Sequence, residues 1–322
     1  MKKLLLSLSA FCLSALPLCA QEASYERDFQ VGFVSPLGTN GTNSSQTTNK
    51  VSINILGGYS KANTIAEFAS IYNINTDYTK GGQFAGVVNY SGELRNGAQF
   101  AGVANISNNV EGGQFAGVIN TAKDVEGIQV ATVLNIAKEL EGVQLGLINI
   151  CESCEEGVPI GLINIVKKGG KCEFEIGISE TLDNFVSFKL GTDRFYTIFS
   201  GGVNYINTPV NYAVGMGFGT HMDWKKEGWA NQIEAMFYNT TEEGEFRKGK
   251  NMLTQLKFIV SKEFSQHFKV FAGPVLNMTI SDYVNPETKE VGSSLVPWSM
   301  WTNDGDKTKL NGWVGLSAGI RF

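Results

Sequence analysis

Two patterns of hydrophobic and polar positions divide this chain. From Val51 to Val166 the motif Q-x-x-G-x-x-N returns about every 15 residues, as in "GGQFAGVVN" at Gly81–Asn89 and "GAQFAGVAN" at Gly97–Asn105. From Cys172 to Phe322, apolar residues alternate with small or polar ones over stretches of roughly ten residues. Both patterns predict strands, so we expect an all-β protein made of two units.

The motif predicts a parallel β-solenoid of about eight coils over residues 51–166. Single strands repeat, rather than pairs of strands, which indicates that successive copies run in the same direction and stack at the spacing of a sheet. We expect one strand of about seven residues in each copy of the motif. Short polar connectors such as "TAKDVEG" and "IAKELEG" should lie between these strands.

The recurring amides predict structural ladders. Stacked copies place equivalent side chains above one another, so each amide can bond to the coils above and below it. The asparagines of the ladder are Asn73, Asn89, Asn105, Asn120, Asn135, Asn149 and Asn164, and the glutamines are Gln83, Gln99, Gln114, Gln129 and Gln144. The alternative is that these rows line a groove that binds sugar or peptide.

The second pattern predicts a small antiparallel transmembrane β-barrel over residues 172–322. Apolar residues would face lipid, and small or polar residues would face the lumen. Eight strands are expected, at Glu173–Ser179, Phe185–Gly191, Phe195–Tyr205, Tyr212–Met222, Trp229–Asn239, Met252–Phe264, Phe268–Ser281 and Gly312–Phe322. Side chains fill a barrel of this size, which excludes a wide pore. We expect Trp224, Trp229 and Trp313 at the membrane interface.

The N-terminus predicts export. Lys2 and Lys3 precede an apolar run that ends before Cys19-Ala20, which is typical of a secretory signal peptide over residues 1–20. A lipoprotein acylated at Cys19 is the alternative. Residues 21–50 read as an N-terminal strand and polar linker. Loss of the two lysines changes the net charge from −5 to −7, and this acidic balance argues against a nucleic-acid partner.

Three cysteines remain after the signal peptide. We expect Cys151 and Cys154 to form a disulfide and Cys172 to stay free. A zinc site would need a second ligand pair near this C-x-x-C, and a thioredoxin-like redox site would need a βαβ pattern around it. Neither is present in the sequence, and we expect no metal and no cofactor.

The order of motifs resembles one known family. "FVSPLGTNGTNSS", "VSINILGGYSKANTIAEFASIYNIN", the repeats, and "VPIGLINIVKKGGKCEFEIGISE" followed by "FKLGTDRFYTIFSGG" resemble the surface-repeat outer-membrane proteins of Bacteroidetes, whose repeat was named from spirochaete surface lipoproteins. The resemblance covers roughly residues 29–322. It implies an outer-membrane or cell-surface location in a Gram-negative bacterium. In that setting the terminal Phe322 resembles the signal that barrel-assembly machinery recognises. The family supplies no catalytic residue.

Few residues suggest catalysis. "GLSAG" at Gly315–Gly319 fits G-x-S-x-G, but a nucleophile elbow needs a strand–turn–helix, and Ser317 lies inside a predicted strand. His221 and His267 lie near strand ends, where a serine–histidine pair would need an acidic partner, as in acyl hydrolases of small outer-membrane barrels. We expect a buried network in the lumen that joins carboxylates to cations: Glu173, Glu175 and Glu234 with Lys257, Lys269 and Arg321.

Our leading hypothesis is a non-catalytic structural or interaction protein, anchored in outer-membrane lipid and displaying the solenoid to an envelope protein or glycan. A small-solute channel or transport accessory and an envelope-modifying enzyme are the alternatives. An even number of strands, with short turns on the periplasmic side, places the solenoid in the periplasm. The word "surface" in the family name describes a repeat and fixes no side.

Overall fold

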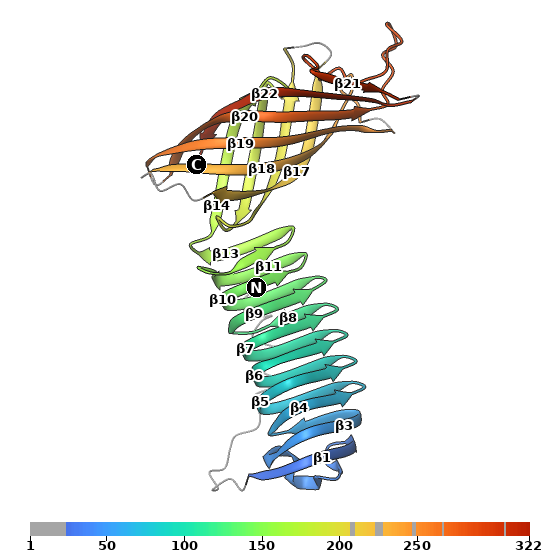
Figure 1. The fold of residues 1–322 in the computed structure, drawn as a ribbon, viewed down its shortest axis with the longest axis vertical. Coiled ribbons are helices and arrows are strands. Elements are labelled where there is room, and N and C mark those ends of the chain that lie inside the picture. Colours follow the sequence, from blue (N-terminus) through green and yellow to red (C-terminus); the bar gives the residue numbers. More distant parts are fainter. Residues whose placement is uncertain (1–23, 207–209, 223–227, 247–248, 266, 306) are drawn as a thin grey trace.

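The computed structural model describes residues 24–206, 210–222, 228–246, 249–265, 267–305 and 307–322. In it a straight column of stacked strands carries a barrel at one end (Figure 1). The predicted signal peptide and Trp224 lie outside the described residues. The predicted fold class is confirmed: a parallel β-solenoid of about eight turns is followed by a closed antiparallel barrel of eight strands.

The solenoid strands pair in parallel from one coil to the next. Gln83 pairs with Gln99 and Gln99 with Gln114, so the motif stays in register along the column. The strands of the column are β1 (Tyr25–Val34), β3 (Thr47–Ser60), β4 (Ala62–Ala69), β5 (Tyr72–Ala85), β6 (Val88–Ala101), β7 (Ala104–Ala116), β8 (Ile119–Thr121), β9 (Asp124–Ala131), β10 (Leu134–Leu145), β11 (Ile148–Ser153), β12 (Val158–Ile160) and β13 (Ile163–Lys168).

The predicted strand and connector positions within a coil were wrong. The chain bends inside the motif, at Gly86–Val87, and the supposed connectors are strands: β9 begins at Asp124, and β10 runs through the second connector. The physical reason is an alternation that the motif obscured. In each connector one apolar residue points into the core between two outward acids. Val125 and Leu140 are such residues, 2% and 1% exposed.

Each coil therefore has three sides, which β6 illustrates. We call them the N side (Val88–Ser91), the acidic side (Glu93–Arg95) and the Q side (Ala98–Ala101), together with the equivalent residues of the other coils. The N side and the Q side meet at the Gly–Val bend, where most coils have glycine and two coils have Ser70 and Thr132 instead. A Cβ on Gly102 would come within 2.1 Å of the Gly86 carbonyl oxygen in the coil before it.

The stack begins before Val51. The expected N-terminal strand exists as β1, and it pairs in parallel with β3, so it adds to the column instead of standing apart from it. The expected polar linker contains β2 (Leu37–Gly38) and the 3-10 helix η1 (Gly41–Gln46). β2 folds back on β1, and together these two short elements occupy the far end of the column.

The barrel strands follow the prediction closely. They are β14 (Lys171–Ser179), β15 (Asn184–Gly191), β16 (Tyr196–Asn204), β17 (Asn211–Met222), β18 (Trp229–Thr240), β19 (Asn251–Ser265), β20 (Phe268–Ser281) and β22 (Lys309–Arg321). Each pairs with its antiparallel neighbour, and β14 closes the barrel against β22. The short strand β21 (Trp301–Asp304) was not predicted; it forms a hairpin with β22 beyond the barrel wall.

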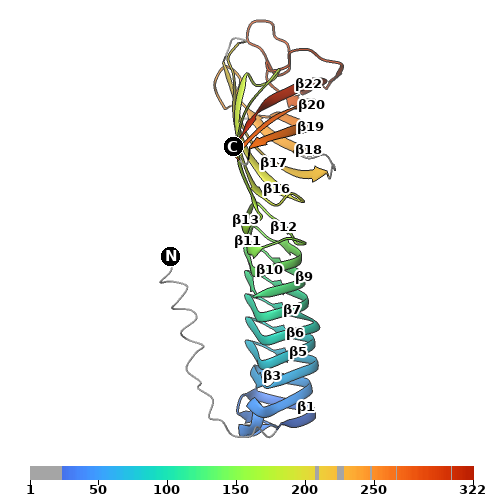
Figure 2. The same ribbon diagram turned by 90° about the vertical axis from the view of Figure 1, so that its left-hand side faces the viewer.

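The column joins the barrel through specific contacts. Thr197 of β16 donates to the carbonyl oxygen of Gly161 at 2.7 Å and receives a hydrogen bond from Asn164 at 3.2 Å. Arg194, in the turn between β15 and β16, donates to the carbonyl oxygen of Glu156. Figure 2 shows the last coils, β11 to β13, lying directly against the barrel. The solenoid is therefore attached at the end of the barrel that holds the 191–195 turn.

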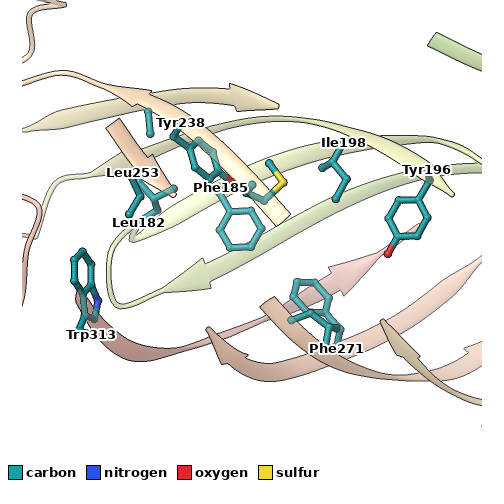
Figure 3. Packing of buried hydrophobic residues seen from close by; sticks show 11 residues of the cluster. Leu182, Phe185, Tyr196, Ile198, Tyr238, Leu253, Phe271 and Trp313 are labelled. Carbon is teal, nitrogen blue, oxygen red and sulfur yellow. The ribbon is translucent and has the colours of Figure 1, made fainter. Parts of the chain in front are cut away.

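The barrel wall separates apolar from polar side chains. Val214, Phe258 and Leu316 point outward and are exposed, whereas Lys257, Ser261 and Arg321 are buried inside. A cluster that includes Phe185, Tyr238 and Phe271 fills part of the interior (Figure 3). The interfacial position expected for Trp313 was wrong. Its neighbour Val314 takes the outward direction, so Trp313 points inward, is 3% exposed, and donates to Glu180.

Candidate functional site

The asparagine ladder runs through the interior of the column. Each Nδ2 from Asn73 to Asn149 donates to the Oδ1 of the next asparagine, at 2.9–3.1 Å. The same nitrogen also bonds to a backbone carbonyl, as Asn105 does with Phe115 at 2.8 Å. All the ladder asparagines are at most 1% exposed. In each of these bonds the acceptor asparagine lies one coil closer to the barrel than the donor. The last asparagine, Asn164, donates to Thr197 of the barrel.

The glutamine ladder runs in the opposite direction. Gln144, Gln129, Gln114 and Gln99 each donate to the glutamine of the preceding coil, at 2.7–2.8 Å. The chain of donors ends at Glu67, which stands in the glutamine position and accepts from Gln83. At the barrel end the next rung is Pro159, whose side chain has no amide to donate, and the Oε1 of Gln144 has no hydrogen-bond partner among the described residues.

These ladders do not form a binding groove. Every glutamine of the ladder is fully buried, so a sugar or peptide outside the column cannot reach it. The groove alternative for the repeated amides was wrong for this geometric reason. The residues that can meet a partner are those that alternate with them and point outward.

The outward residues divide by chemistry. On the Q side, Phe68, Phe84, Phe100 and Phe115 stack with ring centroids 4.9–5.1 Å apart and planes within 7° of parallel. The row continues toward the barrel as Val130, Leu145 and Ile160. Charges gather instead on the acidic side, which carries Glu93, Glu111, Asp124, Glu126, Glu139 and Glu141. Two sides of the column are thus apolar outside, and one is acidic.

The Cys151–Cys154 pair lies in the core of the last coils. The two residues form a disulfide and pack with Ala137, Leu140 and Val166. Cys172 is free and exposed. Its neighbours in β14, Lys171 and Glu173, point into the barrel, so Cys172 points out of it.

A buried ionic network fills the barrel lumen. Lys189 Nζ lies 2.6 Å from both Glu175 Oε2 and Glu234 Oε1. Arg321 reaches the same two carboxylates at 2.5 and 3.3 Å, and Tyr196 donates to Glu234 at 2.9 Å. The predicted carboxylates meet Arg321 here, whereas Lys189 was missed. Its position in "SFKLG" alternates correctly for an inward residue, and that signal could have found it.

The other predicted lumen residues lie at the two sides of this network. Glu173 bonds to Lys269 at 2.8 Å nearer the column end, where Lys171 also reaches it. Lys257 lies over the Phe185 ring, 4.3 Å from its centroid. Farther from the column than Lys257, Gln255 donates a hydrogen bond to Asn277, and Asn277 donates one to Glu180. Charged and polar groups therefore occupy the lumen along its length.

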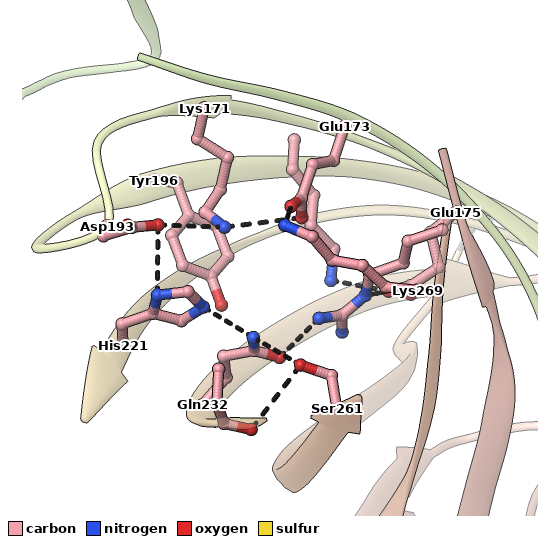
Figure 4. Close-up of polar contacts among 12 residues, drawn as sticks. Lys171, Glu173, Glu175, Asp193, Tyr196, His221, Gln232, Ser261 and Lys269 are labelled. Carbon is pink, nitrogen blue, oxygen red and sulfur yellow. Dashed lines mark hydrogen bonds and ion pairs between the residues drawn. The ribbon is translucent and has the colours of Figure 1, made fainter. Parts of the chain in front are cut away.

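A cleft opens into the barrel at the end nearest the column. Its volume is about 480 Å³, and its lining includes Lys171, Asp193, His221, Gln232 and Lys269. In Figure 4, Asp193 contacts His221 Nδ1, at 3.0 Å, and Gln232 lies between His221 and Ser261. Arg321 donates to the side-chain oxygen of Gln232, so the amide nitrogen faces the imidazole. The hydrogen bond from His221 holds the pKa of Asp193 well below its ordinary value.

This arrangement lacks the contact that nucleophilic catalysis requires. A serine nucleophile needs a direct hydrogen bond to the histidine that takes its proton. Gln232 stands between Ser261 and His221, and it donates to both. Ser317 faces the interior from within β22, and its hydroxyl has no hydrogen-bond partner among the described residues. His267 lines the same cleft at the start of β20.

The described part of the chain contains no group of three or more histidine, cysteine or acidic residues arranged to hold a metal ion. Within the same residues, no helix has the length and apolar character needed to cross a membrane. No family model matches the sequence, and searches of curated proteins and of solved structures found no match either. The resemblance to the surface-repeat family therefore stays a prediction.

Proposed function

We propose that the barrel anchors this protein in the outer membrane of a Gram-negative bacterium and that the solenoid is a non-catalytic structural and interaction element on the periplasmic side. The observation that carries the proposal is the outer surface of the barrel. Exposed apolar side chains point outward from seven of the eight strands of the closed sheet, among them Ile176, Val186, Val214, Phe237, Phe258, Leu276 and Leu316. Lipid is the environment in which such a surface is stable.

The filled lumen supports an anchor in preference to a channel. The Lys189 and Arg321 side chains are at most 1% exposed, and each lies between two carboxylates. An open path would have to separate these charges, and a buried pair that loses one partner is strongly destabilised. The barrel then contributes attachment, and the surface available for recognition is that of the column.

The connections between strands support the periplasmic side. Outer-membrane barrels have short turns on the periplasmic side and longer loops outside. β19 ends at Ser265 and β20 begins at Phe268, whereas β20 ends at Ser281 and β22 begins only at Lys309. The column touches the barrel through Arg194, at the same end as the short connection from β19 to β20; the 180–183 connection at the opposite end is also short. The β21 hairpin belongs to the opposite end.

Thiol labelling tests this placement. In a Cys172→Ser background, Glu139→Cys marks the acidic side of the column and Asp304→Cys marks the β21 hairpin; the native side chains are 60% and 72% exposed. On intact cells, a membrane-impermeant maleimide should label Asp304→Cys and leave Glu139→Cys unlabelled. Permeabilised cells, where both should react, provide the control. Labelling of Glu139→Cys on intact cells would refute the periplasmic placement, and recovery of the protein outside the membrane fraction would refute the anchor.

A further inference from the structure

We infer that the Q side of the column is the docking surface for a second copy of this chain, so that two solenoids pair side by side below their barrels. The inference rests on the proposed function in one respect: both barrels must lie in the same membrane. A shared membrane places both columns on the same side of the bilayer with the same polarity. Their identical Q sides can then meet along their whole length.

The charge distribution selects the apolar sides. From β1 to β12 no charged side chain points outward on the Q side, because Glu67, the one acid in its strands, is fully buried in the core. The acidic side has Asp124 and Glu126 in one coil above Glu139 and Glu141 in the next. Two such sides would repel each other. A second copy can therefore approach only through the uncharged sides.

The spacing of the rows makes two Q sides fit. Paired sheets bury identical side chains in a dry interface when both present them at the same repeat along the stack. Here the rungs are Val31, Ile53, Phe68, Phe84, Phe100, Phe115, Val130, Leu145 and Ile160, each in register with the next. Two copies have the same rung spacing, so a contact made at one rung recurs at all the remaining rungs. Figure 1 shows that the column is straight enough for this to hold along its length.

The symmetry of the pair also avoids charge repulsion. In a two-fold arrangement about an axis parallel to the columns, opposite edges of the two Q sides face each other. One edge of the Q side is the Gly–Val bend, with exposed Val103 and Val118, and the other edge adjoins the row of Glu111 and Glu126. Each glutamate row then lies opposite the apolar bend of the partner copy.

The area is sufficient for a pair held in a membrane. Eight steps of about 4.8 Å give a length of about 38 Å, and four residues at about 3.3 Å each give a width of about 13 Å. Face-to-face pairing covers about 1,000 Å² in total, which is near the lower bound for a specific interface. Confinement of both barrels to one membrane raises the effective concentration of the columns and offsets the modest area.

Crosslinking of the full-length protein in its native envelope tests the pair. In the Cys172→Ser background, Ala98→Cys places a thiol on the Q side, and Glu139→Cys places the matched thiol on the acidic side. A thiol-to-thiol crosslinker with a reach of about 16 Å, enough to span both the ~10 Å between paired sheets and the ~13 Å width of the Q side, should convert Ala98→Cys to a species of twice the mass and leave Glu139→Cys monomeric. Adding Phe100→Lys should lower the Ala98→Cys crosslinking by about tenfold or more, because it places a lysine in an apolar contact. Adding Glu141→Lys should not lower it.

The possible results separate this inference from the proposed function. If Ala98→Cys stays monomeric while the maleimide labelling follows the periplasmic pattern, the pair is refuted and the anchor stands. Equal crosslinking at Ala98→Cys and Glu139→Cys would indicate random collision and refute the pair. A product of another mass would identify a different occupant of the Q side and would also refute the pair. The single Ala98→Cys variant decides the question even if Phe100→Lys fails to fold.

Discussion

Asn105 donates a hydrogen bond to the Oδ1 of Asn120, 3.0 Å away in the next coil, while Gln114 of that coil donates back to the Oε1 of Gln99 at 2.8 Å. The two ladders are therefore antiparallel chains of amide hydrogen bonds inside one column. Each neighbouring coil supplies an acceptor to one chain and a donor to the other, which stabilises the stack in both directions.

Replacing Asn120 with leucine should destabilise the column. Asn120 accepts from Asn105 and donates to Asn135 and to the carbonyl oxygen of Val130, so its loss leaves buried polar groups unpaired. The expected cost is about 1–3 kcal/mol. Denaturant unfolding of the full chain, followed by far-ultraviolet circular dichroism, measures it. Asn108→Leu is the matched control because Asn108 is exposed, and equal losses from both variants would show that the ladder is not what stabilises the stack.

The stability of the column should fall as the pH rises from about 4.5 to 7. Burial of Glu67 raises its pKa from 4.5 to about 7, against hydrogen bonds from Gln83 and Asn75 that lower it. Between these values the folded protein keeps a proton that the unfolded chain releases, so this stabilisation is fully present below about pH 4.5 and is lost as the pH passes 7. Glu67→Gln should remove the dependence, since glutamine is the ladder residue at this position and does not titrate.

The readout for this pH effect must separate column from barrel. All five tryptophans lie at or after residue 224, so tryptophan fluorescence reports on the barrel, and circular dichroism reports on both units. A pH-dependent melting transition that tryptophan fluorescence does not follow belongs to the column. An unchanged pH profile in Glu67→Gln would contradict the assignment to Glu67.

Replacing Lys189 with methionine should destabilise the barrel by about 3–5 kcal/mol, because it leaves Glu175 and Glu234 buried with one cation fewer. Unfolding in detergent, followed by tryptophan fluorescence, is the measurement. Lys309→Met removes an ion pair at a half-exposed site and should change stability little. The double variant Lys189→Met/Glu175→Gln should recover part of the loss, and a loss as large as that of the single variant would argue against a coupled network.

The purified protein should give no steady porin-like conductance in planar bilayers. Side chains fill an eight-stranded barrel, and openings on the order of a nanosiemens need a much wider pore of about sixteen strands. A known sixteen-stranded porin in the same bilayer provides the positive control. Stable openings of that size from this protein would overturn the filled lumen described above.

The sequence predicted most of the barrel because a strict alternation of apolar and polar residues over ten positions fits a two-sided strand and hardly any other element. The start of β20 at Phe268 and the start of β18 at Trp229 were both predicted. The fine structure of the coils was predicted less well. Val125 and Leu140 are single apolar residues among charges, and a strand in which only one side chain faces the core resembles a polar loop.

The cleft could not be assembled from the sequence. Asp193 lies in a turn, and His221 and Gln232 lie on β17 and β18, so only the closed barrel brings them together. Gln232 gave no signal, since an inward glutamine has the same alternation as any polar lumen residue. Trp313 was misplaced because tryptophan is common at membrane interfaces, whereas its direction is set by the strand period.

The two ends of the glutamine ladder also give the column a defined length. Glu67 ends the ladder on one side and Pro159 on the other, while every rung between them is interchangeable with its neighbours. Whole repeats can therefore be gained or lost without changing either end. Each one moves the tip at β1 by about 4.8 Å relative to the barrel. The number of repeats thus sets the distance from the barrel at which this chain holds whatever meets its far end.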